Sequence, residues 1–195
     1  MAKFTTLTSH AVPLPAENVD TDQIIPARFL KVTDKNGLGD SLFCDWRYLE
    51  DGSDNPEFVL NEPASQGAQI LIAGNNFGSG SSREHAPWAL VGWGFRAIIS
   101  TGFADIFESN SLKNGLLPVE VSADVHKALM EAVHLDRSMK ITIDLPTQSV
   151  TGLDGLETTF PIDAFSKHCL LEGLDQLGYL LSFDGQITSY EQQRT

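Results

Sequence analysis

Residues 69–85 read QILIAGNNFGSGSSREH, and this stretch decides the fold. Its first five residues, 69–73, form a short apolar run that is typical of a buried strand. A loop rich in glycine and serine follows, and residues 82–92 have helical character. A strand that passes through such a loop into a helix is the repeating unit of α/β domains, so we expect a mixed α/β fold.

The same alternation continues on both sides of this stretch. We expect further strands at residues 3–14, 96–100, 116–121, 140–145 and 158–160, the last two paired with each other. We expect further helices at residues 103–114 with Gly115 as C-cap, at 123–134 with Ser122 as N-cap, at 163–173 with Asp163 as N-cap, and in the remainder through Tyr190. The end of the chain, residues 185–195, is expected to be frayed. The whole chain, residues 1–195, is predicted to be one domain.

The chain is acidic. Its 195 residues carry 13 Lys+Arg and 26 Asp+Glu, which gives a formal net charge of -13, and 42% of them are hydrophobic. No run of Lys or Arg is present, which argues against nucleic acid and against an anionic membrane surface as partners. Small anions stay open as ligands, because a few arginines and helix N-termini reverse the field locally.

Cys44 and Cys169 are the only cysteines. Two thiols so far apart in sequence make neither a Cys₃ or Cys₄ metal site nor a disulfide framework, so we expect no metal on this chain. No apolar stretch reaches the length of a signal peptide or of a membrane span. We therefore expect a soluble, cytoplasmic protein whose two cysteines are reduced.

The glycine–serine loop carries the densest chemistry. Its backbone N–H groups are expected at a helix N-terminus, where unpaired donors and the helix dipole favour an anion. Gly78 and Gly80 allow close backbone approach. Two hydroxyls, from Ser81 and Ser82, and the guanidinium fork of Arg83 suit a carboxylate. The alternative is an ordinary strand-to-helix turn with a serine N-cap, and the dinucleotide, P-loop and nucleophile-elbow motifs are not matched.

A second polar cluster, residues 18–28, reads NVDTDQIIPAR. The spacing of Asp20 and Asp22 can bind a metal, but no complete set of oxygen ligands follows nearby. An Asx turn with a helix cap is the alternative. Arg28 is either a second carboxylate clamp or a surface charge, and the sequence leaves both open.

Taken together, the two clusters resemble the aconitase superfamily, and within it the family of bacterial 3-isopropylmalate dehydratase small subunits. The segments that carry the resemblance run in family order over nearly the whole chain and are residues 18–22, 24–26, 43–47, 76–90, 103–107, 116–119, 162–165 and 168–169. Among them the core GSGSSREH, residues 78–85, is the most specific. The resemblance implies a swivelling β/β/α domain like the mobile last domain of aconitase.

The resemblance also implies a hydro-lyase that is active only with a separate large subunit, which holds a [4Fe–4S] cluster whose iron acts as a Lewis acid. The implied substrate is a small dicarboxylate in leucine biosynthesis. In that reaction 2-isopropylmalate loses water to give 2-isopropylmaleate, which regains it as 3-isopropylmalate. The close alternative is a small subunit of a related hydro-lyase, either homoaconitase or citraconate/2-methylmalate dehydratase.

Roles for individual residues follow from the resemblance, position by position. Ser81 resembles the general base that removes the proton α to a carboxylate. Ser82 and Arg83 match positions that bind the substrate carboxylate or support the serine alkoxide. Asp22 matches the acidic residue of the superfamily's Thr-Asp-His-Ile segment, in which this chain has Gln23 in place of histidine.

Two further assignments concern substrate binding and specificity. Arg28 is a loose match for the second substrate arginine, because its spacing after Asp22 differs from that of the family. Residues 31–67 form a long irregular segment, of a kind that is often functional. Within its part 31–47, an isopropyl group would need an apolar wall, which could come from Leu38, Leu42, Phe43 or Trp46. Core packing or contact with the partner is the alternative for these side chains.

Two unrelated functions are kept as alternatives. A serine hydrolase would pair Ser81 or Ser82 with His85, because side chains at positions i and i+4 of one helix approach each other. That enzyme would turn over esters without a partner. A non-catalytic module would simply bind small anions through the loop.

Overall fold

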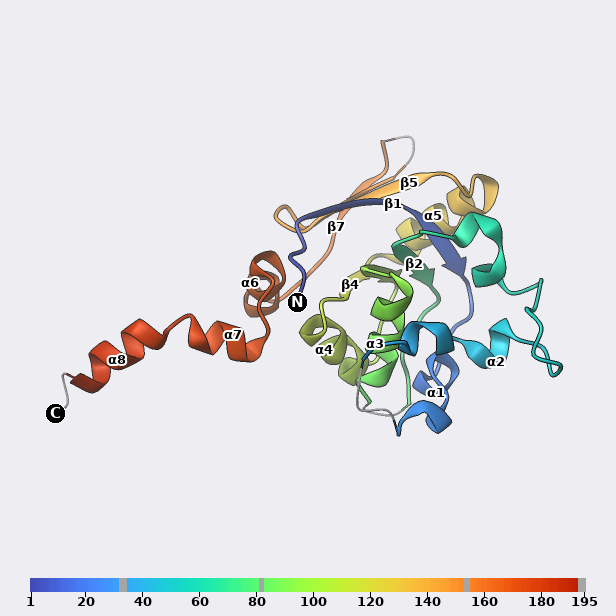
Figure 1. The fold of residues 1–195 in the computed structure, drawn as a ribbon. Coiled ribbons are helices and arrows are strands. Elements are labelled where there is room, and N and C mark those ends of the chain that lie inside the picture. Colours follow the sequence, from blue (N-terminus) through green and yellow to red (C-terminus); the bar gives the residue numbers. More distant parts are fainter. Residues whose placement is uncertain (32–34, 81–82, 153–154, 193–195) are drawn as a thin grey trace.

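A mixed β-sheet organises the chain, and in this computed structural model the described residues are 1–31, 35–80, 83–152 and 155–192 (Figure 1). The sheet has seven strands in the order β4-β3-β2-β1-β5-β6-β7. They are β1 (Thr6–Leu14), β2 (Ile70–Ala73), β3 (Ala97–Ser100), β4 (Leu117–Glu120), β5 (Lys140–Asp144), β6 (Ser149–Thr151) and β7 (Glu157–Thr159).

Helices and short helical turns fill the connections. The α-helices are α1 (Thr21–Ile24), α2 (Cys44–Arg47), α3 (His85–Trp93), α4 (Asp105–Lys113), α5 (Ala123–Leu135), α6 (Ala164–Glu172), α7 (Gln176–Leu181) and α8 (Asp184–Gln192). Four 3-10 turns lie between β1 and β2, namely η1 (Ala27–Phe29), η2 (Leu38–Ser41), η3 (Val59–Asn61) and η4 (Pro63–Ser65). None of the helices in the described ranges is long and apolar enough to cross a bilayer.

The strands β1 to β4 run parallel, and this places the functional loops. β1 pairs with β2, β2 with β3 and β3 with β4 in parallel register, with Leu14 opposite Ala73 at the ends of the first pair. The strands β5 to β7 continue from β1 in antiparallel pairs. Because parallel strands end at the same edge of the sheet, the loops that follow β1, β2 and β3 meet there.

Each face of the sheet has its own apolar core. Leu71 and Ile98 point to the face covered by α1, α3, α4 and the irregular segment, whereas Ile70 and Ile99 point to the face covered by α5 and α6. All four side chains are fully buried. Burial of an aliphatic side chain contributes roughly 1.5–3 kcal/mol, so β2 and β3 form the rigid centre on which the loops are mounted.

The predicted one-domain mixed α/β architecture is confirmed, with differences in detail. The expected caps are present, because Val125 N donates to Ser122 Oγ and Ser166 N donates to Asp163 Oδ1. The prediction that 140–145 pairs directly with 158–160 is wrong, because the short strand β6 lies between them. Three residues are too few to show a strand periodicity.

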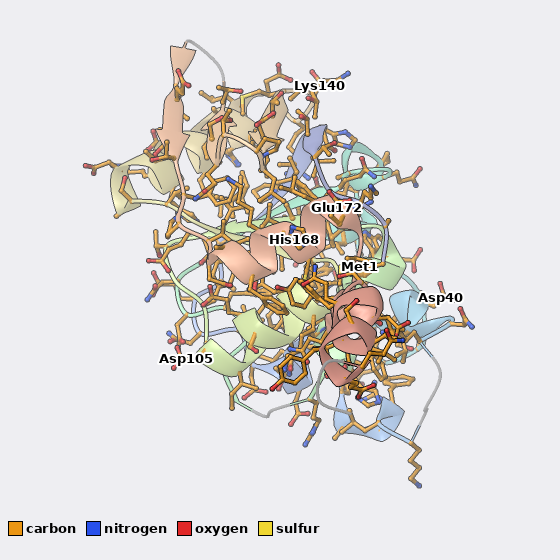
Figure 2. All side chains as sticks on the ribbon, turned by 90° about the vertical axis from the view of Figure 1, so that its left-hand side faces the viewer. Met1, Asp40, Asp105, Lys140, His168 and Glu172 are labelled. Carbon is orange, nitrogen blue, oxygen red and sulfur yellow. The ribbon has the colours of Figure 1, made fainter. Side chains whose placement is uncertain are left out.

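The first residues of the chain are tied to the end of α6. The Met1 amino group donates to the Gly173 oxygen at 3.0 Å, and Lys3 Nζ donates to Glu172 Oε2 at 3.1 Å (Figure 2). Gly173 ends the helix in the left-handed conformation with φ 71°. The residues that precede β1 are therefore fixed to the end of α6.

The C-terminal residues form an arm that projects from the body (Figure 1). Its helices α7 and α8 contain no buried residue, and Tyr179 joins the arm to α6 through ring contacts with Phe165 and His168. The expected frayed tail is helical as far as Gln192, and residues 193–195 lie outside the described part of the chain. The sequence predicts a single last helix, whereas the described residues form two, α7 and α8.

Candidate active site

The structure brings together the two polar clusters singled out in the sequence. Residues 18–24 follow β1, residues 75–80 follow β2, and backbone hydrogen bonds join them like a short parallel ladder. Gly78 N donates to the Val19 oxygen at 2.8 Å, and Thr21 N donates to the Ser79 oxygen at 2.8 Å. The clusters thus form one site at the carboxyl ends of parallel strands, where α/β proteins usually bind ligands.

The loop after β3 contributes the third side of this site. Phe77 forms an isolated parallel bridge with Phe103, and Phe77 N donates to the Gly102 oxygen at 3.2 Å. Next to this bridge, Thr101 Oγ1 donates to Asn75 Oδ1 at 3.1 Å. The glycine–serine loop is therefore held between its neighbours on both sides.

Two asparagines hold the loops together in a strained conformation that the sequence reasoning missed. Asn18 and Asn76 have φ values of 55° and 54°, in the left-handed region. Asn76 Nδ2 donates to Asn18 Oδ1 at 2.9 Å. Asparagine visits this region more readily than most residues, and such strain often marks functional sites. In the sequence, the only sign of this conformation is the presence of asparagine at positions 18 and 76.

Gly78 and Gly80 have the conformations that their predicted role requires. Their φ values are 80° and 94°, which favour glycine. A Cβ at Gly78 would overlap the ring of Phe107, and a Cβ at Gly80 would overlap the carboxylate of Asp20. The bare backbone lets the loop approach other parts of this chain, and its approach to a ligand stays a prediction.

Gly80→Ala is expected to destabilise the protein more than Gly52→Ala, a matched control. Gly52 also has a positive φ, of 83°, but nothing lies within 4 Å of its Cβ position. Both variants adopt an unfavourable φ, and Gly80→Ala additionally forces Asp20 away, which costs about 1–3 kcal/mol more. Urea denaturation measures the difference, and equal losses for the two variants would contradict the close approach.

Asp20 and Gln23 have structural roles. For Asp20, they decide between the metal site and the helix cap that the sequence left open. Asp20 caps α1, accepting from Asp22 N at 2.6 Å, and Gln23 Oε1 accepts from Asp20 N at 2.7 Å in a capping box. The helix-cap alternative therefore holds for Asp20. Gln23, which departs from the superfamily's histidine, closes the cap.

Asp22 and Arg83 face each other across the site. Arg83 Nη1 donates to Asp22 Oδ1 at 2.5 Å, and these side chains remain 33% and 50% exposed for Arg83 and Asp22, respectively. A guanidinium has five N–H donors in a fixed fork, so a pair made through Nη1 leaves others for a ligand. Two residues predicted to bind substrate are therefore adjacent, which their separation in sequence does not show.

Arg83 and Glu84 lead directly into α3, which begins at His85 and not at residue 82 as expected. Among the described side chains, none forms a hydrogen bond that caps this helix. The N-terminal end of the helix dipole therefore faces the loop and favours an anion. The proposed base Ser81 and its neighbour Ser82 lie outside the described residues, between Gly80 and Arg83.

Comparison with known proteins gives the family. Residues 1–124 match the family model described as the aconitase C-terminal domain, and residues 127–164 match the model described as LeuD_N. The 3-isopropylmalate dehydratase small subunit of Chloroflexus aurantiacus is 59% identical over 191 residues, covering 98% of this chain and 95% of that protein. The chain belongs to the family of 3-isopropylmalate dehydratase small subunits.

Other members of the 3-isopropylmalate dehydratase small-subunit family agree over the same length. The small subunit from a Roseiflexus species is 55% identical over 194 residues, covering 100% of this chain and 95% of that protein. A crystal structure of the 3-isopropylmalate dehydratase of Methanocaldococcus jannaschii superposes with a TM-score of 0.67 at 25% identity, covering 95% of this chain and 99% of the other. Both the sequence and the fold of the family are therefore matched from end to end.

Within this family fold, Arg28 has a partner of its own. Its guanidinium forms an ion pair with the Asp45 carboxylate, in which Nη1 donates to Oδ2 at 3.1 Å, and Nη2 donates to Cys44 Sγ at 3.2 Å. The hydrogen bond to Arg28 holds the pKa of Asp45 below its usual range. Among the described contacts none joins Arg28 to Arg83 or Asp22, so its role as a substrate clamp stays a prediction.

The side chains expected to form an apolar substrate wall are mostly in the core. Leu38, Leu42 and Phe43 are 3%, 0% and 0% exposed. Side chains this deeply buried offer no surface to a ligand, so for these three the packing alternative applies. Trp46 is partly buried and stacks on Phe43 with a centroid distance of 5.5 Å. The sequence leaves a pocket wall and core packing both open for these side chains, because burial cannot be seen in it.

The starting point of α3 also bears on the hydrolase alternative. That alternative placed Ser81 and His85 one turn apart on the same helix, but the helix begins only at His85. The His85 ring lies against the Trp88 ring at 4.8 Å. The i, i+4 spacing on one helix therefore does not apply to Ser81 and His85, and Ser81 and Ser82 themselves lie outside the described residues.

No group of three or more His, Cys, Asp or Glu side chains suited to a metal ion is found in the described parts of the chain. The two cysteines are buried in different elements, Cys44 in α2 and Cys169 in α6. An iron–sulfur cluster bound by cysteine needs three or four thiolates close together. The residues of this chain do not fit such a cluster.

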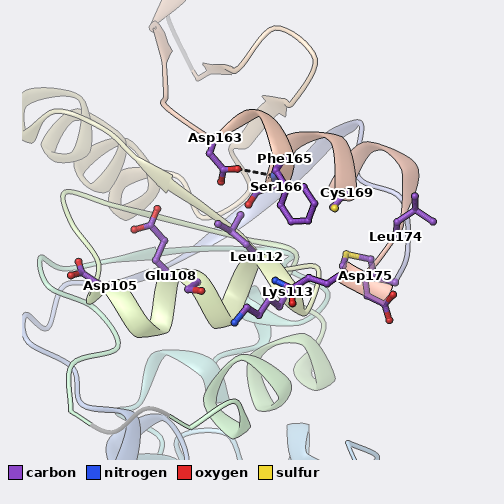
Figure 3. A pocket seen from close by; sticks show the side chains of 13 residues that line it. Asp105, Glu108, Leu112, Lys113, Asp163, Phe165, Ser166, Cys169, Leu174 and Asp175 are labelled. Atoms are coloured by element: carbon purple, nitrogen blue, oxygen red, sulfur yellow. Dashed lines mark hydrogen bonds between the residues drawn. The ribbon is translucent and has the colours of Figure 1, made fainter. Parts of the chain in front are cut away.

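A separate hollow lies between α4 and α6, away from the loop (Figure 3). It measures ≈ 360 Å³ and has acidic walls that include Asp105, Glu108 and Asp163. Burial raises the pKa of the Glu108 carboxyl, and the nearby charges of Glu120, Asp105 and Asp163 raise it further. The ionised form of Glu108 is therefore disfavoured in the folded state.

Glu108→Gln is expected to stabilise the protein at pH 7. A raised pKa in the folded state means that ionisation opposes folding above the ordinary glutamate pKa of about 4.3, and that this penalty vanishes below it. The gain in the free energy of unfolding should shrink as the pH falls toward that value. Glu131→Gln is the control, because Glu131 is exposed and lies 3.9 Å from Lys127. Equal stabilities of Glu108→Gln and wild type at pH 7 would be the contrary result.

Proposed function

We propose that this chain is the small subunit of a 3-isopropylmalate dehydratase and supplies one half of its active site. The observation that carries the proposal is the meeting of Asp22 and Arg83 beside the glycine–serine loop, at the carboxyl edge of the parallel strands. Support also comes from relatives with that name that are 55–59% identical over nearly the full chain.

The proposed reaction moves a hydroxyl group between neighbouring carbons of a small dicarboxylate. The base removes a proton from the carbon α to a carboxylate, and the electron pair forms the C=C bond of 2-isopropylmaleate. The hydroxyl departs as water by taking up a proton from an acid of the assembled site. Water then adds in the opposite sense and gives the isomeric isopropylmalate. This chemistry requires a base, groups that bind the carboxylates, and the exclusion of bulk water.

Ser81 is the proposed base. A serine hydroxyl is a poor base in water, and it can act only if its alkoxide is stabilised by fixed donors and positive charge. The N-terminus of α3 and the guanidinium of Arg83 lie next to it in the chain and can supply both. Ser82 is proposed to bind the substrate carboxylate or to support the same alkoxide.

Arg83 is proposed to bind a substrate carboxylate with the donors that Asp22 leaves unused. Asp22 is then the residue that orients the guanidinium, because it holds one of its nitrogens, Nη1, through a hydrogen bond to Oδ1. An arginine that is held in place before the substrate arrives loses less conformational freedom on binding.

The remainder of the active site is proposed to come from a large subunit. Its [4Fe–4S] cluster is assigned to that partner because the two cysteines of this chain lie in separate elements. Neither half of the site is complete alone, so turnover should require both subunits.

The substrate is tested with the chain and its cognate large subunit purified together without oxygen. The absorbance of the unsaturated product is followed with 3-isopropylmalate, homocitrate and 2-methylmalate as substrates. We expect the highest kcat/KM with 3-isopropylmalate. Preference for homocitrate or 2-methylmalate would assign the chain to a related hydro-lyase, and no turnover of any of them would refute the proposal.

A further inference from the structure

One asparagine side chain joins separate parts of the chain beside the candidate active site. Asn114 directly follows α4, and its Oδ1 accepts hydrogen bonds from Lys35 Nζ and from Trp88 Nε1, each at 2.8 Å. Its Nδ2 donates to the Asn110 oxygen at 2.8 Å and to Glu84 Oε2 at 3.4 Å. Both acceptor positions and both N–H groups of the amide are thus in use.

Two of these partners belong to the start of α3. Glu84 follows Arg83 directly, and Trp88 lies in the first turn of the helix. Because Glu84 and Arg83 are consecutive, a shift of the Glu84 backbone moves the base of the Arg83 side chain as well. The bonds from Asn114 therefore hold the first turn of α3, directly after Arg83.

The third partner belongs to the irregular segment between β1 and β2. Lys35 Nζ lies 5.1 Å from the centre of the Trp88 ring, in addition to its bond to Asn114. Farther along the segment, a Cβ on Gly39 would overlap the backbone of Gly92 at the other end of α3. The stretch from Lys35 to Gly39 is therefore held against α3 at both of its ends.

We propose that Asn114 is a positioning residue for the dehydratase reaction, an inference that rests on the proposed function of Arg83. Its amide joins the start of α3, at Glu84 and Trp88, to the segment at Lys35. An amide is needed because the four partners of this short side chain comprise two donors and two acceptors. Aspartate has no N–H to give Glu84, and leucine can make none of the bonds.

Asn114→Asp is the variant that tests the inference. The volume and the bonds from Lys35 and Trp88 are kept, but a carboxylate oxygen now faces both Glu84 and the Asn110 oxygen in place of the NH₂ group. We expect kcat/KM of the assembled enzyme to fall about 10- to 100-fold, because small misplacements of binding groups have effects of this size. Adding Glu84→Gln restores a donor opposite the new carboxylate, and the double variant should recover most of the loss.

Asn61→Asp is the matched control. Asn61 Nδ2 donates to the oxygens of Arg47 and Asn55, at 2.6 and 2.9 Å, in the irregular segment. This variant loses donors in the same way, so it should lower stability and leave kcat/KM unchanged. If Asn114→Asp and Asn61→Asp behave alike, the role of Asn114 is merely structural and the inference fails.

Hydrogen exchange in the isolated chain gives a reading that does not depend on turnover. Asn114→Asp should speed backbone exchange in peptides covering residues 35–41 and 83–88, and Asn61→Asp should leave both unchanged. Unchanged exchange in Asn114→Asp overturns the inference. If the wild-type complex turns over no substrate, the proposed function fails, and the exchange result then judges separately whether Asn114 holds the two segments.

Discussion

Ser81→Ala should lower kcat of the assembled enzyme by about 10²- to 10⁴-fold, the usual contribution of a general base. The methyl group cannot accept the α-proton, whereas the loop, the ion pair of Arg83 and the N-terminus of α3 remain. Binding of substrate and assembly with the large subunit should therefore be kept. Steady-state kinetics and size-exclusion chromatography of the same preparation measure the two properties.

Ser138→Ala is the control for the loss of a hydroxyl. Ser138 Oγ donates to Asp136 Oδ1 at 2.6 Å in the turn after α5, on the part of the chain remote from the loop. That variant should retain full activity. If Ser81→Ala retains it as well, the base is another group and the assignment of Ser81 is wrong.

Arg83→Lys should lower kcat/KM by about 10- to 100-fold, the equivalent of one lost hydrogen bond to a charged group. Lysine keeps the charge but not the planar fork, so it cannot present donors to Asp22 and to a substrate carboxylate in the same fixed geometry. Most of the loss should fall on KM, because the carboxylate is bound before and during the reaction.

Arg137→Lys is the control for replacing a guanidinium by an ammonium group. Arg137 Nη2 donates to Glu62 Oε2 at 2.9 Å, in an ion pair outside the candidate site. It should leave KM unchanged. An unchanged KM in Arg83→Lys would mean that the guanidinium serves the fold and does not bind substrate.

The sequence predicted the parallel half of the fold well, for a physical reason. Residues 70–73 and 97–100 are buried on both faces, and such strands appear in the sequence as short, nearly continuous apolar runs. The caps Ser122 and Asp163 were predictable because their hydrogen bonds are local. The short strand β6, residues 149–151, was missed because tertiary pairing and not local pattern creates it.

The candidate site was only partly predictable. The glycine–serine loop could be found from its composition, but its contacts are long-range. The pair of Asp22 and Arg83 joins residues 61 positions apart, and no local pattern encodes it. For Phe43 the sequence leaves a pocket wall and core packing both open, and the structure buries this side chain with φ 48°.

The most direct test of the account follows the unsaturated product after 3-isopropylmalate is added to three oxygen-free samples. They are this chain, its cognate large subunit, and an equimolar mixture of both. The account predicts product from the mixture and none above background from either subunit alone. A mixture that assembles but forms no product, or a single subunit that forms it unaided, would contradict the claim that the active site is divided between two chains.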